Sequence, residues 1–360
     1  MVKYLYWLFL HSLVMDYASL RQEIIDAGLL ERQYGYYTFK IASTLGLLAV
    51  SIFVLMRVDS FAIQLFNSVF LAFVFVQIAM LMHDANHQEI FNSGWKNDVV
   101  GLIAGNLMIS ISSSSWKNVH GRHHSAPNVI DHDPDIDIPV LAHSEDQALN
   151  KKGVAKFIVK RQAYLWFPIV SLAAFATRLN HFRQVVLKLA IDRQNIKYYI
   201  TEALLLFIGA MIYFGLVFNF LTFGKAVIFI LTNYLLMGFY MSTVFATNHK
   251  GMPIMKEKSD FLHMQVLTAR DVRGSPVIDF WCGCLNYQIE HHLFPTMPRN
   301  NLSKAKSIVK AFCQKHGINY HESGFFQSYK EILQHIRNVS AVLRKTKTGE
   351  AVNSMAKSSS

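Results

Sequence analysis

The chain has 360 residues, of which 52% are hydrophobic and only 16% are charged. Soluble domains carry roughly 25% charged residues, so this deficit favours a protein embedded in lipid. The net charge of +11 is compatible with anionic lipid or nucleic acid, but no long stretch is both basic and free of hydrophobic segments, which argues against a nucleic-acid-binding domain. Three cysteines are too few for a disulfide framework, and Cys282-x-Cys284 lacks the second pair that a zinc site needs.

The first 38 residues are predicted to form an interfacial or cytoplasmic segment ahead of the membrane domain. Residues 1–15 loosely resemble a signal peptide, but His11 interrupts the apolar run and no small-residue cleavage site follows. The aromatic side chains in this run are typical of a segment that lies at the membrane surface. Residues 345–360 have no periodic apolar pattern and are predicted to be a disordered tail, which leaves residues 39–344 as the membrane domain.

Four apolar stretches are each near the length needed to cross about 30 Å of hydrocarbon. Apart from Lys40 at the start of the first stretch, none contains Lys or Arg. Glu202 is the one acidic residue in them, and its position close to an end predicts that it reaches the headgroups. Two shorter apolar stretches, 99–111 and 163–176, are predicted to be interfacial or re-entrant helices. The predicted membrane-spanning helices are residues 39–56, 61–82, 198–218 and 226–247.

The connections between these spans set the predicted topology. Residues 57–60 and 219–225 are short, so the spans are expected to pair into two hairpins. Only Arg57 and Lys225 of the 35 basic residues fall in these turns. By the positive-inside rule, both termini and both long connections are expected in the cytoplasm. The expected fold is all-α: an integral membrane protein with four transmembrane helices in two hairpins and a cytoplasmic helical cap, in a bacterial inner membrane or the endoplasmic reticulum.

Histidines form the most informative pattern in the chain. There are 16 of them; seven stand in three groups with helical spacing, and an eighth follows the fourth span. Side chains at i and i+4, or at i, i+3 and i+4, project from one face of a helix, so each group would direct its imidazoles to one place. The groups are His83-Asp-Ala-Asn-His87, His120-Gly-Arg-His123-His124 and Gln288-Ile-Glu-His291-His292, and the separate residue is His249.

A cluster of neutral imidazoles indicates a metal site, and its size favours two metals. Imidazole binds iron, copper, zinc and nickel, and eight imidazoles with one amide supply about four or five ligands for each of two ions, which leaves room for dioxygen. All the groups lie at or beyond the predicted cytoplasmic ends of spans two and four, so they can meet without crossing lipid. A zinc peptidase would need His-Glu-x-x-His, but Asp84 stands where that glutamate would be.

The three groups, in the order HDANH, HGRHH and QIEHH, resemble the histidine boxes of membrane fatty-acid desaturases. The stretch GCLNYQIEHHLFPTMPRNNL, which begins at Gly283, is similar to the front-end subgroup, in which Gln replaces the first histidine of the third box. The resemblance covers about residues 29–302. It implies that the cap holds two irons, that molecular oxygen is the co-substrate, and that a cis double bond is inserted into a fatty acyl chain.

The resemblance also implies roles for single residues. Gln288 would bind iron directly or hold a bridging water, because an amide is a weak ligand. His249 matches an additional histidine of the family that follows the fourth span. The histidines implied as iron ligands by the boxes are His83, His87, His120, His123, His124, His291 and His292.

Partners and alternative reactions follow from the same resemblance. The sequence lacks the His-Pro-Gly-Gly motif of an attached cytochrome b5 domain, so we expect electrons from a separate ferredoxin-like or cytochrome b5-like donor with its reductase. The substrate would be an acyl lipid, an acyl-CoA or an acyl-carrier ester, with sphingolipid long-chain bases as an alternative. A di-iron hydroxylase or ketolase on the same scaffold is the alternative reaction. A non-catalytic relative is disfavoured because every box is intact.

Two charged segments have competing interpretations. The loop 131–137 carries four aspartates that either hold imidazoles through hydrogen bonds or form a solvated turn. Asp84, Asn86 and Glu290, inside the boxes, are better candidates for that supporting role on position alone. The basic run 151–161 is expected to contact anionic headgroups, with steering of an acidic electron donor or acyl carrier as the alternative.

Overall fold

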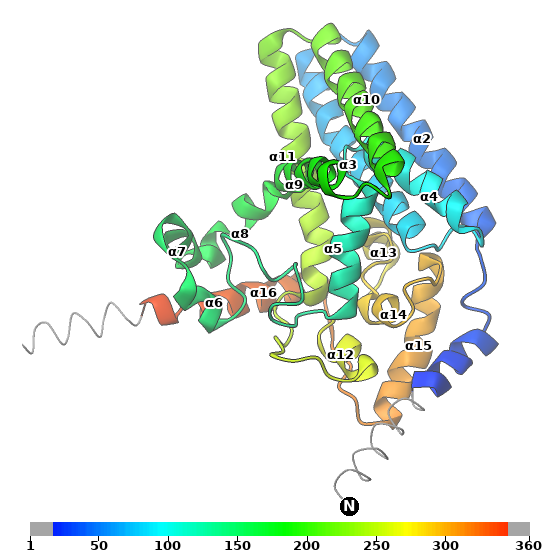
Figure 1. The fold of residues 1–360 in the computed structure, drawn as a ribbon, viewed down its shortest axis with the longest axis vertical. Helices are drawn as coiled ribbons and strands as arrows, with labels where there is room; N and C mark the ends of the chain where they lie inside the picture. Colours follow the sequence, from blue (N-terminus) through cyan, green and yellow to red (C-terminus); the bar gives the residue numbers. More distant parts are fainter. Residues whose placement is uncertain (1–16, 345–360) are drawn as a thin grey trace, which may run out of the picture.

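The computed structural model describes residues 17–344, so the segment predicted at 1–15 and the tail predicted at 345–360 lie outside the described residues. The described chain is almost entirely helical (Figure 1). Its one sheet consists of β1 (Asp271–Val272) and β2 (Glu322–Ser323), which pair in parallel. The predicted helical class is therefore confirmed for this part of the chain.

Four helices of the described chain are long and apolar enough to cross a membrane. Each predicted span lies within one of them, and Figure 1 shows the four side by side at one end of the molecule, with the shorter helices toward the other end. All four leave some large apolar side chains uncovered, as lipid-facing helices do; for example, Phe53 is 63% exposed and Phe207 is 64% exposed. The helices are α2 (Tyr34–Arg57), α3 (Phe61–Asn86), α10 (Ile196–Phe220) and α11 (Phe223–His249).

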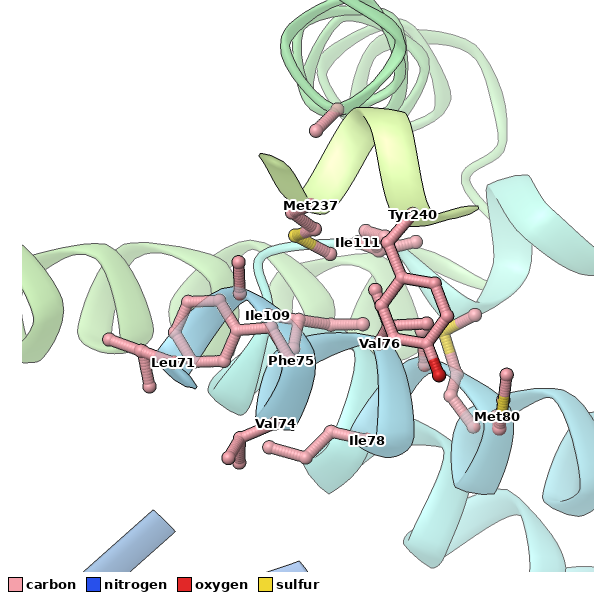
Figure 2. Close-up of a cluster of buried hydrophobic side chains, with 14 of the residues drawn as sticks. Leu71, Val74, Phe75, Val76, Ile78, Met80, Ile109, Ile111, Met237 and Tyr240 are labelled. Atoms are coloured by element: carbon pink, nitrogen blue, oxygen red, sulfur yellow. The ribbon is translucent and has the colours of Figure 1, made fainter. Parts of the chain in front are cut away.

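Helix α3 is apolar on all sides and is buried along most of its length. A helix of this kind must be surrounded by other elements rather than lie at a surface. Figure 2 shows its side chains packed with Ile109 and Ile111, from the segment 109–112, and with Met237 and Tyr240 of α11. Within this apolar cluster, the Gln77 side chain donates a hydrogen bond to the Tyr240 hydroxyl at 3.0 Å, so its amide is not left without a partner.

Between α3 and α10 the chain forms a sharply bent pair of helices. Helix α4 (Gly94–Leu102) continues as a π-helix, η1 (Ile103–Met108), and α5 (Ser113–Ser125) then departs at 111°. The pair is a broken span or a re-entrant loop, in agreement with the helix predicted at 99–111. It approaches α10 so closely that the carbonyl of Leu107 lies against the position that a Cβ on Gly209 would take.

Shorter helices build the remainder of the described chain. The stretch 163–176, predicted as one interfacial or re-entrant helix, is divided at Leu172 between α8 and α9. The bounds of the shorter helices are α6 (Glu145–Asn150), α7 (Gly153–Val159), α8 (Gln162–Ser171), α9 (Ala173–Ile191), α12 (Phe261–Leu267), α13 (Pro276–Cys282), α14 (Gln288–Leu293), α15 (Arg299–Lys315) and α16 (Phe325–Val339).

A second apolar core holds α14, the short helix of the third histidine group. Leu293 of α14 is buried together with Leu302, Val309 and Phe312, which line one face of α15. Leu20, from the helical residues near the start of the described chain, closes the same cluster. A helix of six residues is too short to be stable alone, so this packing is what fixes the direction of its side chains.

Replacing Gly209 by alanine is expected to destabilise the protein, because the added Cβ would meet the backbone carbonyl of Leu107 and force η1 away from α10. Overpacking of this kind costs about 1–3 kcal/mol. Gly215→Ala on the same helix is the matched control, since no atom lies within 4 Å of its added Cβ. Thermal unfolding in detergent should give a lower midpoint for Gly209→Ala only, and equal midpoints would contradict the close approach.

Candidate metal centre

Four elements deliver the predicted site residues to one region. The last turn of α3 carries the first histidine group, α5 carries the second, α11 ends at His249, and α14 carries the third group. Figure 1 shows α5 and α14 next to the part of α11 that is farthest from the turn between α10 and α11. Histidines four residues apart lie on the same face of their helix, as predicted. The ring centroids of His83 and His87 lie 4.5 Å apart, and those of His120 and His124 also lie 4.5 Å apart.

One group of four histidines comes from three of these elements. Each of His83, His87, His120 and His291 offers a ring nitrogen, and these nitrogens all lie within 4.8 Å of one another. The buried Nε2 of His87 and both ring nitrogens of His291 have no hydrogen-bond partner in the described chain. Buried imidazole nitrogens are ordinarily hydrogen-bonded, so their common direction suits a bound cation.

A second group consists of His123, His249 and His292, whose ring nitrogens also lie within 4.8 Å of one another. The Nε2 atoms of His249 and His292 face each other at 3.0 Å. His123 joins them through its ring, with centroids 4.5 Å from His249 and 5.1 Å from His292. The histidine that stands alone in the sequence is therefore brought into the centre with the boxes.

His124 and Gln288 connect to these two groups. The Nε2 of His124 lies 3.0 Å from that of His120 in the first group, and its ring stacks on His292 of the second group at 4.0 Å. The amide nitrogen of Gln288 lies 3.0 Å from the Nε2 of His249, while its oxygen accepts a hydrogen bond from Asn248 at 2.9 Å. All nine predicted residues thus meet in one place, and direct binding of a metal by Gln288 stays a prediction.

The Nδ1 atoms on the other side of the rings fix which nitrogen carries the proton. The Nδ1 of His249 lies 3.0 Å from the carbonyl oxygen of Thr268, and the Nδ1 of His292 lies 2.8 Å from the side-chain oxygen of Gln265. Both oxygens only accept, so both Nδ1 atoms must be protonated. The Gln265 amide is held in this orientation because its nitrogen donates to the carbonyl of His124 at 2.9 Å. Each ring therefore directs the lone pair of its Nε2 into the centre.

Two lone pairs that face each other at 3.0 Å cannot form a hydrogen bond. Burial, together with the neighbouring histidines, also holds the pKa of His291 and of His292 well below its usual value, so these rings are uncharged at neutral pH. A transition-metal cation among the Nε2 atoms would convert this unfavourable arrangement into a favourable one, and iron is among the metals that imidazole binds. The residues present fit a metal centre.

The acidic loop contributes one buried carboxylate to the site. Both oxygens of Asp133 lie 3.0 Å from the Nδ1 of His123, while Asp131 and Asp137 of the same loop are exposed. Burial alone would lower the pKa of His123, but the carboxylates of Asp135 and Asp133 raise it above its usual value. A carboxylate on the distal nitrogen of a metal-binding histidine orients the ring and strengthens it as a ligand. The supporting interpretation of the loop is confirmed for Asp133, and its ends form a solvated turn.

Among the three acidic and amide residues inside the boxes, Asp84 alone contacts a predicted ligand. Its Oδ1 lies 3.4 Å from the Nδ1 of His83, and its Oδ2 lies 3.0 Å from the Nε of the buried Arg299. Asn86 instead accepts a hydrogen bond from Ser113, and Glu290 accepts one from Tyr320. Position within a box is therefore a poor guide to which side chains support the imidazoles.

The prediction that Glu202 reaches the headgroups is wrong. Its side chain is fully buried and accepts hydrogen bonds from the hydroxyls of Ser112 and Ser114, from the backbone N–H of Ser114 at 2.9 Å and from Asn106 at 3.3 Å. The bent pair of helices covers this end of α10, which the hydropathy of α10 alone does not reveal. A carboxylate at the first turn of α5 also opposes the positive end of that helix dipole.

Sequence reasoning missed three residues that hold the site. Gln265 and Thr268 lie on and directly after α12, three residues apart, and no spacing rule connects them with histidines elsewhere in the chain. Arg299 lies seven residues after His292 and is one of many basic residues in the chain. Nothing local in the sequence distinguishes Arg299, although a fully buried arginine almost always has an acidic partner, here Asp84.

The long apolar helices and the two histidine clusters together place this protein in the class of helical membrane proteins with a polyhistidine site. The family model "Fatty acid desaturase" matches residues 60–324. The chain therefore belongs to the fatty acid desaturase family.

Relatives from moss, a protist and a nematode support this membership. The chain is 30% identical to a Delta(8)-fatty-acid desaturase of Euglena gracilis over 94% of this chain and 81% of that protein. It is 29% identical to the Delta(6)-fatty-acid desaturase fat-3 of Caenorhabditis elegans over 91% of this chain and 75% of that protein. It is 28% identical to an acyl-lipid (9-3)-desaturase of Physcomitrium patens over 91% of this chain, and the match spans 63% of the moss protein's length.

Asp133→Asn should lower metal affinity and activity by roughly 10–100-fold, because an amide is a weaker acceptor for the Nδ1 proton of His123. Asp137→Asn is the matched control, since this residue lies in the same loop and is exposed. Metal content after purification and turnover of the loaded enzyme measure the effect. If both variants keep the wild-type metal content and rate, Asp133 does not orient the ring.

Glu202→Gln is expected to lower the stability of the protein by about 1.5–3 kcal/mol, because the charged acceptor of the hydrogen bonds from Ser112 and Ser114 is lost. Thr201→Ala on the next position is the control, because that side chain is exposed and bonds only to its own helix. Thermal unfolding in detergent tests this. Unchanged midpoints for both variants would show that the carboxylate does not hold α5.

Proposed function

We propose that this protein is an oxygen-dependent fatty acyl desaturase that introduces a cis double bond into the acyl chain of a lipid. Membership of the desaturase family and relatives named as fatty acid desaturases support the proposal. The observation that carries it is the presence of two groups of buried or half-buried histidines whose ring nitrogens lie within 4.8 Å of one another inside each group. That number and arrangement of imidazoles suits two metal ions and exceeds what one ion can use.

The two groups divide the predicted ligands between two irons. His124 lies between the groups and would complete either coordination sphere, while Gln288 would hold a water or bind weakly beside the second iron. The first iron would be held by His83, His87, His120 and His291, and the second by His123, His249 and His292.

Removal of hydrogen from an unactivated methylene is beyond acid–base side chains, so the bound irons with dioxygen would supply the oxidising power. The chain's own task is orientation and exclusion of water. Asp133, Gln265 and the Thr268 carbonyl hold the rings with their lone pairs inward. Met80 and Met82, which lie three residues and one residue before His83 on α3, belong to the apolar cluster that keeps water from this side of the centre.

The orientation in the membrane follows from charge. At the turns between α2 and α3 and between α10 and α11, the basic residues are only Arg57, which ends α2, and Lys225, in the first turn of α11. We therefore place these turns on the non-cytoplasmic side and the centre on the cytoplasmic side. The helices would then form two hairpins. Electrons would reach the centre from a separate ferredoxin-like or cytochrome b5-like protein on that side.

Expression of the full chain in a host with a defined lipid profile tests the proposed reaction. New fatty acids that are lighter than their precursors by about 2 mass units are expected, and mass spectrometry of derivatised chains locates the double bond. Products that are heavier by about 16 mass units would instead establish a hydroxylase, since insertion of oxygen and loss of two hydrogens are the two outcomes open to such a cofactor.

His291→Ala is expected to abolish the product and to lower the iron content of the purified protein, because this ring touches His83 and His87 of the first group. His132→Ala is the matched control, since His132 is exposed and belongs to neither group. Iron analysis and the lipid profile are measured for both variants. Full iron content and full product in His291→Ala would refute the ligand assignment.

A further inference from the structure

A basic pocket lies away from the histidines, where the turn between α7 and α8 meets the end of α16. It has a volume of about 360 Å³ and is lined by Lys160, Arg161, Tyr164, Arg337 and Arg344. No acidic residue lines it. Its two sides are far apart in the sequence, and Figure 1 shows α7 and α16 together on the side of the molecule away from α2.

Hydrogen bonds from Arg344 to backbone carbonyls connect the two sides of the pocket. One guanidinium nitrogen of Arg344 donates to the carbonyl of Lys160 at 3.2 Å, and the other donates to the carbonyl of Arg337 at 2.7 Å. Arg344 therefore ties the α7–α8 turn to the last turn of α16. The guanidinium of Arg161, which also lines the pocket, lies over the ring of Phe157 at 4.0 Å from its centroid.

Three of the basic side chains that line the pocket have no acidic partner in the described residues. Lys160, Arg161 and Arg337 have no carboxylate within ion-pair distance in residues 17–344. Cations gathered around one cavity repel one another, and a bound anion removes that repulsion. Arginine side chains bind phosphate in particular, because their planar fork matches two phosphate oxygens.

The neighbouring surface indicates where the anion comes from. Beside the pocket, two short helices leave large apolar side chains uncovered, and such patches mark contact with a membrane or a partner. The other end of α8 packs on α11, where the Ser242 hydroxyl donates to the carbonyl of Val170 at 3.2 Å, seven residues before the end of that membrane-spanning helix. The uncovered side chains are Val154 (75% exposed), Phe157 (58%), Tyr164 (78%) and Phe167 (40%).

We propose that this pocket binds the phosphate of an anionic membrane phospholipid, whose acyl chains cover the exposed apolar side chains of α7 and α8. A soluble phosphate ester would satisfy the charge but would leave those side chains in water, which favours the lipid. The site is separate from the histidine centre, so it is a lipid-anchoring site rather than part of the reaction. It fixes α7, α8 and the end of α16 at the headgroup level of the bilayer.

Native mass spectrometry of the purified full chain in detergent tests this with phosphatidylglycerol, and with phosphatidylcholine of the same acyl chains for comparison. We expect wild-type protein to retain phosphatidylglycerol preferentially. Arg161→Gln combined with Arg337→Gln should weaken its binding at least about tenfold, because two charge-assisted contacts to phosphate are lost. Lys152→Gln is the matched control, since Lys152 is exposed on the same basic run but does not line the pocket.

Two outcomes would overturn the proposal. In the first, the double variant retains phosphatidylglycerol as well as the wild type does. In the second, coenzyme A or inorganic phosphate binds the wild type as tightly as phosphatidylglycerol, which would make a soluble phosphate ester the occupant. Thermal unfolding in lipid-free detergent shows whether the double variant is folded, and Arg337→Gln alone, at an exposed position, serves as the deciding variant if it is not. Neither measurement requires turnover, so the result is independent of the desaturase assignment.

Discussion

The rest of the structure is arranged around imidazole nitrogens that present lone pairs to one another. His249 and His292 illustrate this, since their Nε2 atoms lie 3.0 Å apart while both Nδ1 atoms donate to fixed oxygens. In an interior of low polarity, lone pairs that face each other repel, and a cation among them would remove that repulsion. The folding energy of the surrounding helices must therefore hold the rings in place until a metal is bound, and several features described above serve that purpose.

Some of these features contact the imidazole rings directly, and others hold the helices that carry the rings. Asp133, Gln265 and the Thr268 carbonyl contact the imidazoles directly. Farther out, Glu202 of α10 binds the first turn of α5, and the core around α15 fixes α14. Two of the histidine helices, α5 and α14, are thus attached to elements that have no part in the centre itself. This separation allows ring positions to be fixed within fractions of an ångström although no single short helix is rigid alone.

Most of the fold and the centre could be predicted from the sequence, because periodic patterns control them. Spans follow from runs of apolar residues, and the histidine groups follow from i, i+3, i+4 spacing, so all nine predicted residues meet. Contacts between residues far apart in the sequence leave no periodic pattern, so they could not be predicted in this way. Glu202 looked like a headgroup contact because the bend that buries it is formed by residues about 90 positions away, and Gln265 carries no local mark of its role. Asp133 was recognisable because it lies only ten residues after its histidine.

The order of the elements along the chain has a consequence for biosynthesis. α3 is made long before α14, and a stretch of about 200 residues separates the first histidine group from the third. While the ribosome is still adding that stretch, the nascent chain has only part of either proposed ligand set, because each set draws on residues at or beyond His249. Metal loading on this assignment is a late step that follows membrane insertion, and a chain cut short before α14 would have no complete site to load.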